Sequence, residues 1–213
     1  GPTHHGAFDL SYLRCIPNMV IGAPSDENEC RQILYTAYRH PGPAAVRYPR
    51  GTGPGSLIEE AMSELPIGKA VVVREGQRVA LLNFGALLSE ALEAGERLGA
   101  TVVDMRWVKP LDEDLVRDLA VRNEYLVTLE ENAVAGGAGS AVAEFLAQER
   151  LDTPMRHIGI PDRFSEHGGQ DELRVQAGLT ADAIFEVVTQ ELDAVFAHAP
   201  GPERVLVGAA ENH

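Results

Sequence analysis

Short apolar runs alternate along this chain with segments of helical periodicity, and this alternation limits the fold more than any other feature. Apolar runs at 19–23 and 44–48 flank a helical segment whose start is marked by Ser25, a suitable N-cap. The apolar residues of that segment repeat at helical spacing and predict one buried face: Cys30, Ile33, Leu34, Ala37 and Tyr38. Strand, helix and strand in this order predict a βαβ unit with parallel strands.

A second series of the same kind follows residue 66. We expect strands at 70–73, 79–82, 101–103, 125–129 and 155–160, the first two joined by a turn at Glu75-Gly76. Helices of this series are expected at 88–98, at 112–120, from the glycine-rich turn 136–140 to Gln148, and at 184–195. A further short helix is expected near the start of the chain, at 8–14. The chain is therefore predicted to have an α/β fold, with a mostly parallel sheet in its second part.

Residues 51–66 carry three glycines and two prolines without strong periodicity, which predicts a linker. We therefore expect a first domain at 1–50, a linker at 51–66, a second domain at 67–197 and a tail at 198–213. The chain opens on loop residues with no preceding element, so either it begins inside a domain or these residues are a cloning scar.

The excess of acidic residues limits the kinds of partner that this chain can bind. With 32 acidic and 18 basic residues, a formal net charge of -14 argues against a nucleic-acid or anionic membrane surface as the main partner. We find no apolar run long enough to span a membrane and no secretory signal. Cys15 and Cys30 form neither a disulfide framework nor a zinc-binding spacing. A cytoplasmic setting is therefore expected.

Two basic groups of residues could bind a ligand. His4 and His5 lie in a loop, where they are either a tag remnant or side chains at the ligand-binding edge of a sheet. Arg47 and Arg50 flank Tyr48-Pro49 and are either solvated or an anion clamp, since a guanidinium matches phosphate geometry. Because residues three apart in an extended chain point to opposite sides, we expect only one arginine to reach a shared ligand.

For the other polar motifs we favour a structural role over a functional one. The glycine-rich turn 136–140 is either a phosphate cradle or a helix start that allows close packing. Glu130 and Glu131 are either an acid or metal pair or a solvated strand end. His157 is expected to be a satisfied histidine of a core or an interface, and His167 to lie in a loop. Ser11 and Ser140 lack the context of a hydrolase nucleophile.

Several longer motifs, taken in order, resemble one enzyme family. They are GPTHHGAFDLSYLR (1–14), APSDENE (23–29), AVRYPRG (45–51), LPIGK (65–69), VDMRWVKPLD (103–112), and EEN (130–132) followed by GGAGS (136–140). The chain resembles the 1-deoxy-D-xylulose 5-phosphate synthases, which are thiamine diphosphate-dependent enzymes related to transketolase. The resemblance runs from residue 1 to about 196 and is highly specific.

The resemblance implies a function. Members of this family condense pyruvate with glyceraldehyde 3-phosphate, release carbon dioxide and feed isoprenoid and thiamine biosynthesis. They use thiamine diphosphate and magnesium, and they are homodimers. Residues 1–50 would be the second half of a pyrimidine-binding domain, and 67–197 a complete transketolase C-terminal domain. His4 would be the catalytic histidine, and Arg50 would hold the phosphate of the acceptor.

The chain also departs from the family pattern. The glutamate that activates the cofactor and the motif that holds magnesium and diphosphate are absent, so we expect cofactor and metal to be bound mainly by residues outside this chain. The chain would then be part of a longer enzyme and would be inactive alone. His5 stands where many relatives have glutamine. Two alternatives remain: a non-catalytic dimerisation or interaction module, and the β chain of a thiamine-dependent 2-oxoacid dehydrogenase.

Overall fold

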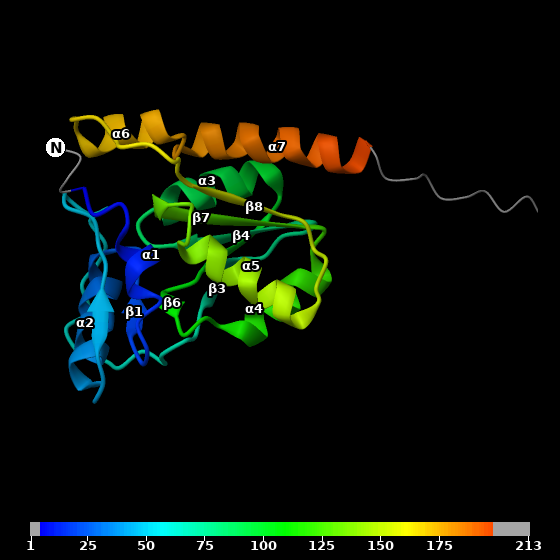
Figure 1. Cartoon of the computed structure of the whole chain (residues 1–213). Coiled ribbons are helices and arrows are strands. Elements are labelled where there is room, and N and C mark those ends of the chain that lie inside the picture. Colours follow the sequence, from blue (N-terminus) through cyan, green and yellow to red (C-terminus); the bar gives the residue numbers. More distant parts are fainter. Residues whose placement is uncertain (1–4, 198–213) are drawn as a thin grey trace, which may run out of the picture.

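The larger of two sheets organises the structure, a computed structural model that describes residues 5–197. Its strands lie in the order β3-β5-β4-β7-β8 (Figure 1). The bounds are β3 Val71–Arg74, β4 Val79–Phe84, β5 Thr101–Asp104, β7 Tyr125–Ala133 and β8 Met155–Ile160. All pairs are parallel except β3 with β5, so the predicted α/β fold with a mostly parallel sheet is confirmed.

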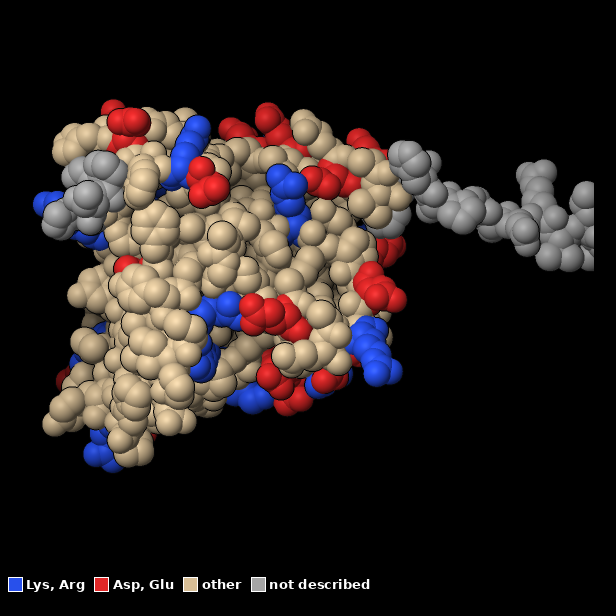
Figure 2. All heavy atoms as spheres, viewed as in Figure 1, with Lys and Arg blue, Asp and Glu red and all other residues tan. Residues whose placement is uncertain are grey.

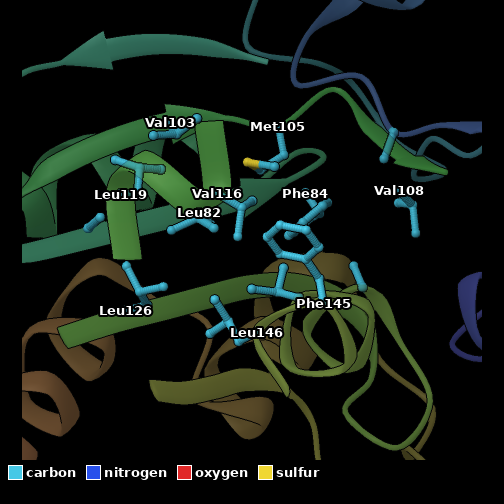
Figure 3. Close-up of a cluster of buried hydrophobic side chains, with 14 of the residues drawn as sticks. Leu82, Phe84, Val103, Met105, Val108, Val116, Leu119, Leu126, Phe145 and Leu146 are labelled. Carbon is cyan, nitrogen blue, oxygen red and sulfur yellow. The ribbon is translucent and has the colours of Figure 1, made fainter. Parts of the chain in front are cut away.

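Helices cover both faces of this sheet, as expected for parallel strands. One face packs against α3 (Leu88–Leu98) and α7 (Ala181–Ala197), and the other against α4 (Glu113–Arg122) and α5 (Ala138–Glu149). Successive residues of β4 alternate between the two cores. Figure 3 shows Leu82 and Phe84 of β4 meeting Phe145 and Leu146 of α5.

The smaller sheet has the order β2-β1-β6, with bounds β1 Val20–Gly22, β2 Ala44–Val46 and β6 Trp107–Lys109. β1 and β2 are parallel and are joined by α2 (Glu27–Arg39), which confirms the βαβ unit. β6 pairs antiparallel with β1, although it follows β5 in the chain. We did not predict this strand, because a three-residue strand before Pro110 carries no periodicity of its own. The two parts of the chain therefore share a sheet.

The predicted burial of α2 is confirmed at Ile33, which is fully buried, but is wrong at Leu34 and Tyr38. Leu34 is 56% exposed and Tyr38 is 85% exposed, whereas the buried positions include Glu29, Gln32 and Thr36. The N-cap is also Asp26 rather than Ser25, because the Asp26 side chain accepts a hydrogen bond from the backbone N–H of Glu29. A mostly polar face of the helix is thus the one that packs inward.

The segment 51–66 explains this inversion. It contains no helix or strand, as predicted, but it lies along α2 and is bound by its polar side chains. Gln32 Oε1 accepts from the Ser63 N–H at 2.7 Å, and Thr36 Oγ1 accepts from the Leu65 N–H at 2.8 Å. Arg31 donates to backbone carbonyls of the same segment. The proposed linker is therefore a strap, and the division into domains on either side of it stays a prediction.

Three further elements differ from expectation. β3 and β4 follow one another in the chain, yet β5 lies between them in the sheet. Helix α6 (Gln170–Ala177) was not predicted, because it has no buried residue and hence no apolar stripe. β7 extends four residues past the predicted strand end. The short helix at 8–14 is present as α1 (Asp9–Leu13), whereas the tail at 198–213 lies outside the described residues.

Candidate active site

A cavity of about 530 Å³ lies where the first described residues, the end of β2, the end of β7 and helix α6 meet. Such crevices at the carboxyl ends of parallel strands are the usual ligand sites of open α/β sheets. Its polar lining comes from both parts of the chain: His5, Asp9, Arg47, Arg50, Glu131, Ser165, His167, Gln170 and Arg174.

The two arginines predicted as an anion clamp both line the cavity but differ in their partners. Arg47 donates from Nη1 to Glu131 Oε2 at 3.2 Å and from Nη2 to the Glu131 carbonyl at 2.7 Å. Arg50 is exposed and makes no hydrogen bond or ion pair with a described residue. The guanidinium of Arg50 is therefore available to an anionic ligand, whereas that of Arg47 is neutralised.

Glu131 holds two arginines at once. Its Oε1 accepts from Arg174 Nε of α6 at 2.8 Å, while its Oε2 accepts from Arg47. Arg174 also pairs with Glu90 of α3 at 3.1 Å. Glu131 is only 7% exposed and Glu130 is fully buried, so our interpretation of these two residues as a solvated strand end is wrong. The extension of β7 carries both carboxylates into the interior.

Glu130 occupies the glycine-rich turn that we considered as a phosphate cradle. Its carboxylate accepts from the N–H groups of Ala138 at 2.7 Å and Gly139 at 2.9 Å, at the start of α5. A Cβ at Gly137 would lie 2.2 Å from Glu130 Oε2, which explains the glycine there. The phosphate interpretation is therefore wrong, because a buried carboxylate already fills the anion site of this helix.

The burial of Glu130 changes its proton affinity. Desolvation raises its pKa to about 7, against the lowering effect of the two amide hydrogen bonds and of the more distant Arg47 and Arg14. The carboxylate therefore titrates near neutral pH, although it lies at a helix N-terminus.

The histidines fall in different places. His4 lies outside the described residues. His5 lines the cavity, and its Nδ1 is buried without a hydrogen-bond partner among the described residues. His167 also lines the cavity. His157 lies 2.8 Å from Thr128 Oγ1, and burial lowers its pKa, which agrees with a satisfied histidine.

Asn132 ties the start of the chain to the end of β7. Its Oδ1 accepts from the Leu10 N–H at 3.1 Å, and its Nδ2 donates to Ser11 Oγ at 2.9 Å. The adjacent Ala133 N–H donates to the Ala7 carbonyl at 2.6 Å. The strand end 131–133 thus contacts both segments for which ligand-binding residues were predicted.

Sequence reasoning missed a buried acid pair away from the cavity. Ser25 Oγ lies 2.9 Å from Glu29 Oε2 and 2.6 Å from Asp104 Oδ2, and Glu29 pairs with Arg106 at 2.5 Å. One hydroxyl hydrogen cannot serve two carboxylates, so a proton on Asp104 completes the chain of hydrogen bonds. Burial, followed by the charge of Glu29, raises the Asp104 pKa well above its ordinary value. This pair joins α2 to β5; its residues lie in the motifs 23–29 and 103–112, but nothing in either motif indicated that the two contact each other.

The described residues do not fit a diphosphate and its metal ion. Among residues 5–197, no group of three or more His, Cys, Asp or Glu side chains is placed to hold a metal. The one glycine-rich helix start considered for phosphate is filled by Glu130.

No helix in the described part of the chain has the length and apolar character needed to cross a membrane.

Family models match both parts of the chain. "Transketolase, pyrimidine binding domain" matches residues 1–55, and "Transketolase, C-terminal domain" matches residues 68–184, which is more than half of the chain. The chain belongs to the transketolase C-terminal domain family. In this transketolase-family chain the cavity lies between the two matched regions, with residues on both walls.

Curated relatives are similar over almost the whole chain. It is 58% identical over 192 residues to the 1-deoxy-D-xylulose-5-phosphate synthase of Cellvibrio japonicus, covering 90% of this chain and 30% of that protein. It is 60% identical over 184 residues to the enzyme of the same name from Yersinia pseudotuberculosis, covering 86% and 30%. The transketolase-family chain thus spans about 30% of the length of these relatives.

Solved structures agree in fold. A structure described as "Split gene transketolase, inactive beta4 tetramer" is 34% identical, has a TM-score of 0.80, and is matched over 90% of this chain and 63% of that one. A transketolase from Campylobacter jejuni is 20% identical with a TM-score of 0.65, matched over 89% of this chain and 29% of that one, and shows the fold alone.

Proposed function

We propose that this chain is the acceptor-binding part of a 1-deoxy-D-xylulose-5-phosphate synthase, which condenses pyruvate with glyceraldehyde 3-phosphate and releases carbon dioxide. The observation that carries the proposal is the guanidinium of Arg50, which has no partner among residues 5–197 and lines a cavity of about 530 Å³. High identity to enzymes of that name supports it over the 2-oxoacid dehydrogenase alternative.

Arg50 is the proposed ligand of the acceptor's phosphate. Its planar guanidinium can donate two parallel hydrogen bonds to phosphate oxygens, which fixes orientation as well as position. Arg47 cannot serve the same ligand without breaking its bonds to Glu131. A fixed phosphate holds the aldehyde of the acceptor at a defined distance from the donor and removes much of the entropic barrier to carbon–carbon bond formation.

His4 is the proposed catalytic histidine, which would exchange protons with the reacting carbonyl oxygens. His5, with an unpartnered buried Nδ1, supplies a further polar atom in the cavity. Thiamine diphosphate and Mg²⁺ belong in this proposal to parts of the enzyme outside this chain, since the described residues do not fit them. This chain then contributes acceptor binding and proton transfer.

The partners in this proposal are the remaining part of the longer enzyme and a second copy of it, in a cytoplasmic homodimer. Figure 2 shows that the face over α1 and α2 carries few charged side chains. Large exposed apolar residues gather on these elements and next to them: Phe8, Tyr12, Leu34, Tyr38 and Tyr48. The same face supports the second candidate, a non-catalytic interaction module, when the chain is isolated.

Steady-state kinetics of the full-length enzyme test the proposal. Arg50→Gln should raise the KM for glyceraldehyde 3-phosphate at least about tenfold and leave the KM for pyruvate within about twofold. Arg163→Gln is a matched control, because Arg163 is exposed, bonds the Gln176 carbonyl and is not among the residues that line the cavity. An unchanged KM for the phosphorylated acceptor in Arg50→Gln would refute the assignment.

A further inference from the structure

We propose that Glu131 is a positioning residue for the acceptor's phosphate: it anchors Arg47 and so fixes the segment 47–51 that presents Arg50. The inference rests on the proposed function of Arg50. It assigns a role in acceptor selection to a residue of the C-terminal region, which acts through Arg47 and Arg50.

The contact between Glu131 and Arg47 has two points. Arg47 donates to both the carboxylate and the backbone carbonyl of Glu131, at 3.2 and 2.7 Å. Both side chains are largely buried, with 12% and 9% of their surface exposed. Two hydrogen bonds from one planar guanidinium fix its orientation, and solvent hardly competes for them.

Arg47 is joined to Arg50 by a stiff link. The segment between them is Tyr48-Pro49, in which the proline ring fixes one backbone dihedral and restricts the residue before it. Gly51 lies against α6, since a Cβ there would fall 2.6 Å from Gln170 Oε1. An anchor at residue 47 and a wall at residue 51 confine the backbone that carries Arg50.

Glu131 also ties down that wall. Its second oxygen accepts from Arg174 of α6 at 2.8 Å, so one carboxylate connects the segment 47–51 with the helix that faces it across the cavity. Glu131 pairs with both Arg47 and Arg174, and Glu90 supplies Arg174 with a second negative charge, so Arg50 is left as the unpaired guanidinium in the described lining. Without this carboxylate, Arg47 would keep its bond to the backbone carbonyl of Glu131 but lose the second point of contact, and the segment 47–51 would be less firmly held. The phosphate would then no longer be held at one place.

The decisive experiment compares two acceptors in the full-length enzyme. Glu131→Gln keeps the size of the side chain but removes its charge. We expect the ratio of kcat/KM for glyceraldehyde 3-phosphate to kcat/KM for unphosphorylated D-glyceraldehyde to fall about tenfold. Activity with D-glyceraldehyde should change less than about twofold, which also reports that the variant is folded and holds its cofactor. Glu149→Gln is the matched control, because Glu149 pairs with Arg117 on the surface.

A double-mutant cycle separates this inference from the proposed function. If Glu131 acts through Arg50, then Glu131→Gln should have little effect on selectivity in an Arg50→Gln background. Arg47→Lys, which keeps the charge but not the two-point contact, should lower the ratio as Glu131→Gln does. Equal losses with both acceptors, or additive losses in the cycle, would overturn the positioning role. An unchanged ratio in Arg50→Gln alone would instead overturn the proposed function.

Discussion

The two parts of this chain differ in how completely they cover their own sheets. The five-stranded sheet has helices on both faces and two apolar cores, formed largely by residues after 66. The three-stranded sheet takes β6 from the second part, and its own core cluster of buried residues is Val20, Ile33 and Trp107. The first part nevertheless carries His5 and Arg50, two residues of the candidate site. The part with the weaker core therefore holds most of the predicted chemistry and depends on its neighbours for support.

The largest expected effect concerns separation of the two parts. Residues 67–197 alone should unfold in one cooperative transition, because they keep one core whole and the other except for Leu10, Ile21 and Ala23. Residues 1–66 alone should show none, since they lose β6 and the support of β7. Circular dichroism during thermal denaturation measures this. A cooperative transition in the 1–66 fragment would contradict the comparison.

Two leucines, Leu82 of the five-stranded sheet and Leu34 of α2, test the difference in burial between the two parts of the chain. Leu82 is fully buried between β4 and the α4–α5 layer, so Leu82→Ala should lower the free energy of unfolding by about 3–5 kcal/mol. Urea denaturation of the chain gives the value. A loss below about 1 kcal/mol would mean that this core is not well packed.

Glu130 should make the stability of the second part of the chain depend on pH. A carboxyl group whose pKa is raised by folding stabilises the protein below its unfolded pKa and loses that contribution as the pH rises. With an ordinary value of 4.5 and a folded pKa of about 7, stability should decline between these values, by up to about 3 kcal/mol. Glu130→Gln should flatten this slope in denaturation curves at several pH values. An unchanged slope would show that Glu130 stays charged.

The smallest effect is expected at Leu34. Leu34→Ala should change the unfolding free energy of the chain by less than about 0.5 kcal/mol, because the side chain is 56% exposed. In the full-length enzyme the same change should weaken association if this face is covered there. Urea denaturation and analytical ultracentrifugation measure the two quantities. A large loss in the chain alone would mean that this face of α2 is already buried.

Local signals were enough to predict the βαβ unit and the parallel strands, whereas contacts between distant segments decided what was missed. The apolar stripe of α2 predicted Ile33 correctly but not Leu34 and Tyr38, because the segment 51–66 binds the polar side of the helix. β6 exists only through its pairing with β1. Neither partner is visible in a local sequence window.

In the candidate site, too, local sequence signals were enough for some residues, whereas contacts between distant segments decided the others. The residue types of Arg47 and Arg50 indicated anion binding, but only the structure separates a neutralised arginine from an unpaired one. Glu131 looked like a solvated strand end because its partners are 43 and 84 positions away. A pair of acidic residues directly after a buried strand was the available signal, and the arginines that bury it could not be assigned from spacing.

The proposed binding of the acceptor's phosphate by Arg50 is tested most directly by a binding measurement. Titration calorimetry of the full-length enzyme with glycerol 3-phosphate, an unreactive phosphorylated analogue, should show binding that Arg50→Gln weakens at least about tenfold. Glycerol without the phosphate should show no difference between the two proteins. Equal affinity of wild type and Arg50→Gln for glycerol 3-phosphate would contradict the account.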